Sequence, residues 1–171
     1  PELAGLVLLA APARPLQTIY LEQIETLAAL DGDIDADEQA RIDAERAKAA
    51  AVANLTEHSP AAENLLGLPG RYWVDLRAYD PVDVAAGLPQ PLLVLQGERD
   101  YQVTPDGDFV RWRERFANEA RVVLRDFPGL NHLFIRGEGT PGPAEYGQPG
   151  HVDATVIEAI ADWMGDGDGA Q

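Results

Sequence analysis

The sequence predicts an α/β fold built on a parallel sheet. Two apolar runs of strand length, residues 92–95 and 122–124, flank a segment at 105–118 that has the amphipathic pattern of a helix. Two strands joined by a helix form a parallel crossover unit. A third apolar run, residues 3–11, fits a strand buried on both faces of the same sheet, and a buried helix segment is the alternative for a run of that length.

Each crossover strand is followed by a loop that carries one ionisable residue. Asp100 follows the first strand and His132 follows the second, in each case after a break at glycine or proline. Because the carboxyl ends of parallel strands share one edge of a sheet, both residues are expected at that edge. Open α/β sheets place their binding and catalytic sites there.

Composition limits the class of protein and its partners. The 171 residues are enough for one domain with a hydrophobic core, and 46% hydrophobic content is ordinary for a globular protein. The 13 basic and 29 acidic residues give a net charge of −16, which argues against nucleic acid or an anionic membrane as a partner. No run is long enough for a membrane span, and the first residues lack the basic start of a signal peptide. The absence of cysteine excludes thiol catalysis and is compatible with either redox compartment, so the sequence assigns no location.

Two helices are expected after the first strand. From Pro15 onward, apolar residues recur on one face of a helix: Leu16, Ile19, Tyr20, Ile24, Leu27 and Leu30. A second helix is expected from Asp35, where Asp35 and Glu38 have the spacing of a capping box, to about Leu55. The aspartates between the helices resemble a calcium loop, but Ala36 and Ile42 occupy the places of its glycine and glutamate, so a solvated turn is expected and no metal.

Residues 65–88 alternate turn signals with aromatic side chains. Tyr72, Trp73 and Tyr79 either line a binding pocket or pack this part of the chain onto the sheet, and packing is the favoured interpretation. Asp80 followed by Pro81 is typical of a helix start.

The crossover helix and the last helix both carry apolar faces. After a start at Thr104–Pro105, one helix face is expected to carry Phe109, Trp112, Arg113 and Phe116, with Val110 beside them, and the aromatic residues are expected in the core. The last helix, residues 152–164, is expected to turn four side chains toward the sheet: Val152, Val156, Ile160 and Trp163. Between these helices, residues 137–150 are too rich in glycine and proline for regular structure and are expected to run over the surface near His132. Residues 165–171 are expected to be disordered.

Three stretches resemble one family. LQGERDYQV around Asp100 and PGLNHLF around His132 look like the loops after the last two strands of α/β-hydrolases, and YWVDLRAYDP at residues 72–81 resembles a stretch of bacterial dienelactone-hydrolase-like and prolyl-oligopeptidase-like serine esterases. The resemblance covers most of residues 4–164. It implies the carboxyl-terminal half of an α/β-hydrolase fold, with about three parallel strands, flanking helices and a helical cap insertion.

The resemblance also implies a division of the chain. Residues 1–14 and 89–164 would form the α/β-hydrolase core, residues 15–88 a helical cap insertion and a return segment, and residues 165–171 a tail. The cap would act as a lid that contacts the substrate. The strand at residues 3–11 would lie beside the strand at Leu92 and face absent strands on its other side, so the missing amino-terminal half or a second copy of the chain is an expected partner.

The family orders its triad as nucleophile, acid and histidine, which gives Asp100 the role of the acid and His132 that of the base. The nucleophile lies on a G-x-S-x-G elbow that this chain lacks, and its oxyanion hole is absent too. The one serine, Ser59, precedes Pro60 and reads instead as a helix N-cap. His58 and His151 have no comparable context and are expected at the surface before a cap and before the last helix.

The expected function is therefore that of the acid and histidine half of a serine hydrolase, acting on carboxylic esters or related acyl bonds through an acyl-serine. A non-catalytic fragment, or an interaction domain with the same fold, is the alternative. Trp73, Tyr72 and Tyr146 are the candidates for contact with a small acyl or ester substrate. No cofactor is expected, because Gly5 and Gly97 stand alone and form no phosphate-binding loop.

Overall fold

A computed structural model describes residues 3–59 and 64–167 of the chain. Its centre is a parallel three-stranded sheet in the order β1 (Leu6–Leu9), β4 (Leu92–Gly97) and β5 (Val122–Phe127). Leu6 lies opposite Leu92, and Leu92 lies opposite Val122. The α/β class, the parallel pairing and the order of the strands are confirmed. β1 is shorter than the apolar run at residues 3–11, and Ala10 directly after it has a left-handed backbone with φ of 47°.

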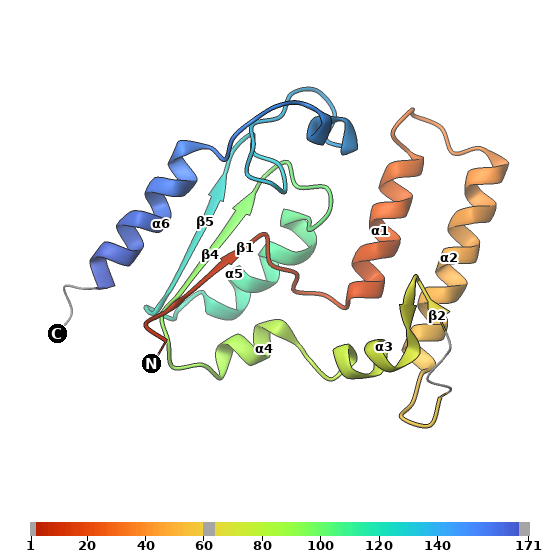
Figure 1. The fold of residues 1–171 in the computed structure, drawn as a ribbon, viewed down its shortest axis with the longest axis horizontal. Coiled ribbons are helices and arrows are strands. Elements are labelled where there is room, and N and C mark those ends of the chain that lie inside the picture. The colour runs from red at the N-terminus through yellow and green to blue at the C-terminus, as the bar shows by residue number, and fades with distance from the viewer. Residues whose placement is uncertain (1–2, 60–63, 168–171) are drawn as a thin grey trace.

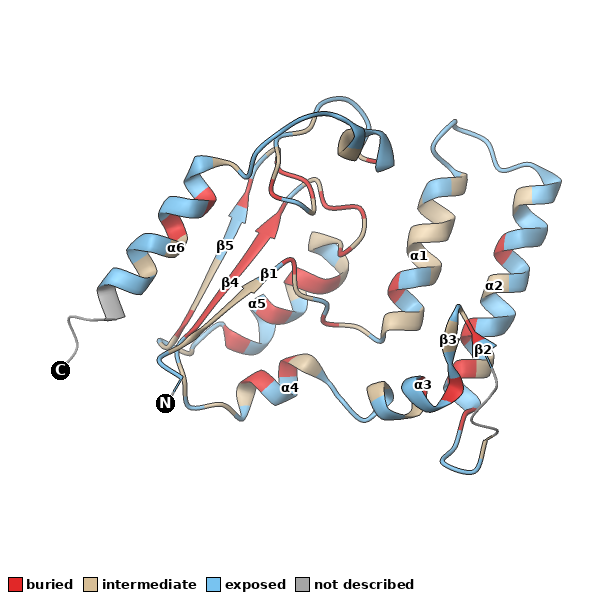
Figure 2. Cartoon of the chain, viewed as in Figure 1, coloured by how far each residue is buried: buried red, intermediate tan, exposed pale blue. Residues whose placement is uncertain are grey.

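Helices cover both faces of the sheet (Figure 1). α4 (Pro81–Ala86) and α5 (Val110–Phe116) lie on one face, and α6 (Ala154–Gly167) lies on the other. β4 is buried along its whole length, as Figure 2 shows. Because side chains alternate along a strand, Leu92 and Val94 pack in the cluster with α4 and α5, whereas Leu93 and Leu95 pack in the cluster with α6.

The crossover segment is helical, as expected, but it begins with a wider turn. Residues Pro105–Phe109 form a π-helical turn (η1) before α5. Thr104 caps this turn by accepting a hydrogen bond of 3.2 Å from the Gly107 N–H, and the expected start at Thr104–Pro105 is confirmed. The turn directs the fully buried Asp108 toward the β1–α1 connection, where it accepts a hydrogen bond of 2.8 Å from the Ala13 N–H. The expected core aromatics of this segment are buried: Phe109, Trp112 and Phe116.

The segment between β1 and α4, residues 15–80, is called the insertion below and contains two long helices, α1 (Leu16–Ala28) and α2 (Ala36–Asn54). The capping box is confirmed: the Asp35 carboxylate accepts from the N–H groups of Asp37 and Glu38, and the Glu38 side chain accepts from the Asp35 N–H. Along α1, however, only part of the apolar face is covered. Ile19 is buried, but Tyr20 and Leu27 on the helix and Leu30 just after it are more than a third exposed.

The rest of the insertion builds a small core of its own. The hairpin of β2 (Asn64–Leu65) and β3 (Leu68–Pro69) leads into α3 (Gly70–Arg77), and Trp73 packs there against Val52 and Leu65. The expectation that the aromatics of this region pack onto the sheet is therefore wrong. Trp73 is 2% exposed inside the insertion, and Tyr72 and Tyr79 are exposed by 46% and 67%. The start at Asp80–Pro81 is confirmed, because the Asp80 carboxylate caps α4.

The C-terminal segment differs from expectation in three details. Residues 137–150 are largely irregular but include a 3-10 turn, η2 (Pro143–Gly147). Val152 is 44% exposed because α6 starts only at Ala154, while Val156, Ile160 and Trp163 pack in the sheet cluster as expected. α6 extends to Gly167, so the first residues of the expected tail form its last turn. Residues 168–171, and the helix start expected at Pro60, lie outside the described residues.

Candidate active site

The loop after β4 is shaped by Asp100, whose side chain has no exposed surface. Asp100 Oδ1 accepts hydrogen bonds from the N–H groups of Gln102 and Val103, at 2.8 and 3.0 Å. This is the local turn that aspartate commonly stabilises. Asp100 Oδ2 accepts a third hydrogen bond, of 3.1 Å, from Gln96 Nε2 at the end of β4. Both oxygens of the carboxylate are thus held by hydrogen bonds, and Oδ2 can accept one more.

That further partner is His132, on the loop after β5. His132 Nδ1 lies 2.8 Å from Asp100 Oδ2, a hydrogen-bond distance, and both residues lie at one edge of the sheet as expected. Because an ionised carboxylate can only accept, Nδ1 carries the hydrogen and donates it, which leaves the second ring nitrogen, Nε2, as the basic one. The ring is 29% exposed. Within the described residues, the geometry therefore provides an oriented imidazole with a free basic face.

Asn131 shapes the histidine loop in the same way that Asp100 shapes the acid loop. Its Oδ1 accepts hydrogen bonds from the N–H groups of Leu133 and Ile135, at 3.0 and 3.2 Å. The backbone of Phe134 takes a left-handed conformation with φ of 56° inside this turn. Asn131 is 1% exposed, and sequence reasoning did not select it. An asparagine directly before His132 could have indicated this role, because asparagine side chains commonly close turns by bonding the backbone two residues further on.

The two loops are in backbone contact at Gly97. A Cβ at this position would lie 2.5 Å from the Leu130 carbonyl oxygen and 2.6 Å from that of Asn131. In addition, the Arg99 N–H donates a hydrogen bond of 2.9 Å to the Leu130 carbonyl. Glycine is required here because no side chain fits between the loops.

Tyr146 reaches the same region from η2. Its ring stacks on that of Tyr101, the residue after Asp100, with ring centroids 6.0 Å apart. The hydroxyl of Tyr146 is buried, with no hydrogen-bond partner among the described residues. Burial raises the pKa of Tyr146 above its usual value, and the neighbouring Tyr101 adds to the shift. The phenol therefore stays neutral and keeps its proton to donate.

The other two aromatic candidates do not join this site. Trp73 is buried in the core of the insertion, and its Nε1 donates a hydrogen bond of 2.7 Å to the Leu65 carbonyl. Its indole has almost no surface left to offer a ligand, so the expected contact with substrate is not supported. Tyr72 is half exposed and meets Trp73 edge to face.

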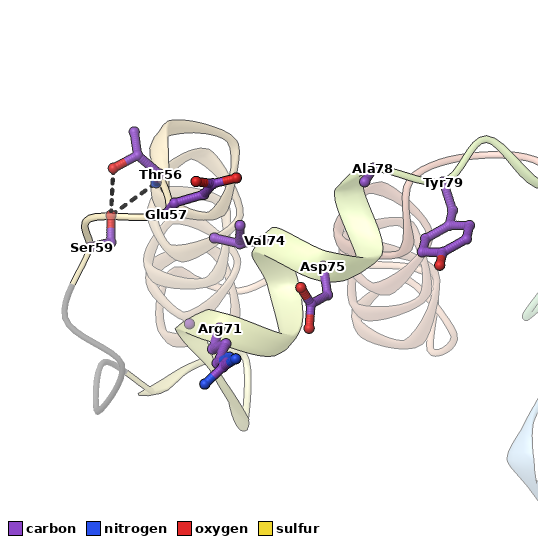
Figure 3. Close-up of a pocket in the computed structure, with 9 residues that line it drawn as sticks. Thr56, Glu57, Ser59, Arg71, Val74, Asp75, Ala78 and Tyr79 are labelled. Atoms are coloured by element: carbon purple, nitrogen blue, oxygen red, sulfur yellow. Dashed lines mark hydrogen bonds between the residues drawn. The ribbon is translucent and has the colours of Figure 1, made fainter.

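Ser59 lies away from the Asp100–His132 pair, in the turn after α2. Its Oγ accepts a hydrogen bond of 2.9 Å from the Thr56 N–H, and within residues 3–59 and 64–167 no imidazole forms a hydrogen bond with it. Figure 3 shows that it borders an open groove along α3. The lining residues are Thr56, Glu57, Ser59, Gly70, Arg71, Val74, Asp75, Ala78 and Tyr79. Since a serine nucleophile needs an adjacent base, the environment of Ser59 does not activate it. His58 and His151 are both exposed, as expected.

Metal and membrane criteria give negative results for the described part of the chain. No group of three or more His, Cys, Asp or Glu side chains there is arranged to hold a metal ion. No helix among the described residues has the length and apolar character needed to cross a membrane.

Fold and site together define an α/β protein with a three-stranded parallel sheet, whose carboxyl edge carries a hydrogen-bonded aspartate–histidine pair. The chain is similar to the esterase EstD of Thermotoga maritima, with 39% identity over 160 residues. The match covers 94% of this chain and 37% of that protein, so the chain spans a little over a third of the length of this relative. The chain is thus related to part of a bacterial esterase. No model of a protein family matches it.

Proposed function

We propose that these residues supply the acid and the base of a serine ester hydrolase with the α/β-hydrolase fold. The observation that carries the proposal is the 2.8 Å contact between Asp100 Oδ2 and His132 Nδ1 at the carboxyl edge of the sheet. Both residues follow consecutive parallel strands, in the order that this family uses for acid and histidine. The relation to a bacterial esterase supports the same class of reaction. We also propose that the protein belongs to the dienelactone-hydrolase-like subfamily, because residues 72–81 resemble a stretch of those esterases.

The chemistry follows from the pair. A serine hydroxyl outside these residues attacks the ester carbonyl carbon and passes its proton to His132 Nε2. Asp100 holds the ring in the required tautomer and stabilises the imidazolium cation. The imidazolium then gives the proton to the departing alkoxide, so that an alcohol leaves and an acyl-serine remains. In the second half of the cycle, a water loses a proton to His132 and attacks the acyl carbon. The bond to the serine oxygen then breaks, the imidazolium returns its proton to that oxygen, and the acid leaves.

We further propose that the α1–α2 insertion is a lid over this site. Gln23 Nε2, on α1, donates a hydrogen bond of 3.0 Å to the Gln102 carbonyl in the acid loop. In the turn just after α1, the side chain of Leu30 would lie 3.4 Å from a Cβ on Gly142. α1 and the turn after it therefore reach both the acid loop and the segment that carries Tyr146. Its exposed apolar side chains, together with Tyr146, are the proposed contacts for the acyl group; Tyr72 is a weaker candidate.

The test uses the full-length protein that contains these residues. His132→Ala and Asp100→Asn should each lower kcat/KM for an activated phenyl ester by about 10³-fold or more, because each removes one member of the triad. His151→Ala and Asp126→Asn, which alter exposed groups of the same types, are the matched controls and should leave the rate unchanged. Full activity of His132→Ala would refute the proposal.

The position of the nucleophile is tested by a fluorophosphonate that labels activated serines. The labelled peptide should lie outside these 171 residues. The isolated chain should hydrolyse the same ester no faster than its own His132→Ala variant, because both the serine and the oxyanion hole are supplied from elsewhere. Labelling of Ser59, or an acyl-enzyme burst on the isolated chain, would show that the nucleophile has been misplaced.

A further inference from the structure

Three loops of the candidate site meet at one nearly buried carboxylate, that of Glu145. Its Oε1 accepts a hydrogen bond from Arg99 Nη2, and its Oε2 accepts one of 3.2 Å from Asn131 Nδ2. The Glu145 side chain is 9% exposed and that of Arg99 is 19% exposed. Arg99 directly precedes Asp100, and Asn131 directly precedes His132. Glu145 therefore binds the immediate neighbours of both members of the pair.

Further contacts fix the segment of residues 137–150 against these loops. Arg99 Nη1 donates a hydrogen bond of 3.1 Å to the Gly139 carbonyl. A Cβ on Gly137 would lie 2.3 Å from Glu145 Oε1, so the carboxylate is packed tightly against the backbone of its own segment. The guanidinium of Arg99 thus joins the acid loop to this segment at two points, the Glu145 carboxylate and the Gly139 carbonyl.

Each loop is closed by hydrogen bonds of its own that do not involve Glu145, whereas Glu145 contacts both loops. Asp100 closes the acid loop on its own backbone, and Asn131 closes the histidine loop on its own backbone. The two loops are joined by the contact of Gly97 with the Leu130 carbonyl, by the hydrogen bonds from the Arg99 N–H to that carbonyl and between His132 and Asp100, and by the bridge through Glu145. A hydrogen bond between charged groups that are shielded from water is stronger than a hydrogen bond between neutral groups. The bond between Arg99 and Glu145 is of this charged kind.

We propose that Glu145 is a positioning residue, which holds Asp100 and His132 at hydrogen-bond distance by clamping Arg99 and Asn131. This inference rests on the function proposed above for the roles of Asp100 and His132 as acid and base. The effect of Glu145 on the position of the His132 ring does not depend on that function. Loss of the carboxylate charge leaves the guanidinium of Arg99 without its anion, and the acid loop then moves relative to the histidine loop. A displacement of about 1 Å at such a pair is enough to cost about 100-fold in rate.

The primary test is NMR of the ring protons of His132 in the full-length protein, with Glu145→Gln as the variant. Glutamine keeps the volume and an acceptor for Asn131 but removes the charge that Arg99 needs. In the parent protein the Nδ1–H proton of His132 should be observed in slow exchange with water, because Asp100 holds it. In Glu145→Gln this signal should broaden or vanish, and kcat should fall about 10- to 100-fold with KM nearly unchanged. Glu138→Gln, an exposed change of the same kind in the same segment, is the matched control and should alter neither quantity.

A second variant covers the case in which Glu145→Gln does not fold. Arg99→Met combined with Glu145→Met removes both charges, and apolar replacement of a buried ion pair commonly preserves folding. This variant should also lose the His132 Nδ1–H signal and show the lower kcat. The inference is overturned if either folded variant keeps the signal and the kcat of the parent, even where thermal stability falls. If the parent shows the signal but hydrolyses no ester, the function proposed above fails while the clamp stands.

Discussion

Gly97 lies so close to Leu130 that a Cβ on the glycine would be 2.5 Å from the leucine carbonyl oxygen. This contact joins the end of β4 to the loop after β5, and the Asp100–His132 pair lies directly beyond it. The separation of acid and base therefore depends on how closely these two stretches of backbone approach, in addition to the proposed Glu145 clamp.

Gly97→Ala should push the acid and histidine loops apart. The clash involves backbone atoms that cannot rotate away, so we expect a loss of about 1–3 kcal/mol in the free energy of unfolding, typical of overpacking. In the full-length protein, kcat/KM should fall at least tenfold. Gly165→Ala on α6, where a Cβ meets nothing within 4 Å, is the control and should be neutral or stabilising. Urea unfolding and steady-state kinetics measure the two effects, and equal behaviour of both variants would contradict the packing argument.

Local features of the fold could be read from the sequence because they depend on neighbouring residues. The capping box at Asp35 and Glu38 and the cap at Asp80 are examples, since both ends of each hydrogen bond lie within three residues. The pairing of the strands could also be predicted, because apolar runs joined by a helix have few arrangements.

Contacts between distant segments could not be predicted in the same way. Glu145 is 46 residues from Arg99, and nothing in a glycine- and proline-rich segment indicates that one of its carboxylates is buried in the site. The prediction that Trp73 packs onto the sheet was wrong for a related reason. Trp73 packs in a separate hydrophobic cluster within the insertion, and the sequence does not show which cluster a tryptophan joins. Prediction of the acid and histidine succeeded to the extent that the two side chains meet; their catalytic role remains a prediction.

Asp108 anchors the connection between β1 and α1 to the core. Its carboxylate has no exposed surface and accepts from Arg14 Nη2 at 2.7 Å and from the Ala13 N–H at 2.8 Å. Asp108→Ala leaves the guanidinium of Arg14, which is only 12% exposed, without this anion. We expect a loss of about 3–5 kcal/mol in the free energy of unfolding, as for other broken buried pairs.

An exposed ion pair provides the comparison for Asp108. Arg46 bonds Asp43 and Glu25, but its side chain is 51% exposed. Arg46→Ala should therefore cost no more than about 1 kcal/mol. Replacement of the whole buried pair, Arg14→Met with Asp108→Leu, should recover part of the loss. Urea denaturation of the full-length protein distinguishes these cases, and a similar cost for Asp108→Ala and Arg46→Ala would contradict the assignment of Asp108 as an anchor.

Asp153 gives the stability of α6 a dependence on acid pH. The pKa of Asp153 is lowered, chiefly because its carboxylate accepts hydrogen bonds from the hydroxyl and the N–H of Thr155, at 2.7 and 3.0 Å. A carboxyl whose pKa is lower in the folded state contributes stability above its unfolded pKa, near 3.8, and loses it as the pH falls through the folded value. Asp153→Asn should therefore unfold at a lower temperature than the parent at pH 7, and the difference should shrink below about pH 4. A difference that stays constant across this range would show that charge is not involved.

The two edges of the sheet differ in character. β5 carries the exposed charged residues Arg125 and Asp126, whereas β1 reads LVLL and exposes half of Leu9. Charged side chains blunt an edge strand against further pairing, and β1 has none. Among the described residues, no strand pairs with the outer side of β1.

The isolated chain should therefore associate through β1, remain partly molten, or require the amino-terminal half of the protein as its partner.

A proline variant of β1 tests this prediction. The N–H groups of Leu6 and Ala10 donate hydrogen bonds of 3.0 and 2.9 Å to the carbonyls of Pro91 and Leu95. Because N–H groups alternate in direction along a strand, the N–H group of Leu9 points to the open side of β1. Leu9→Pro removes that donor and no bond to β4, and it should weaken association about tenfold. Leu8→Pro removes an inward donor and should unfold the sheet instead. Sedimentation at high salt measures association, because the net charge of −16 is then screened. A parent chain that is monomeric there, unfolds cooperatively and binds no apolar dye would show that the outer side of β1 is not a pairing surface.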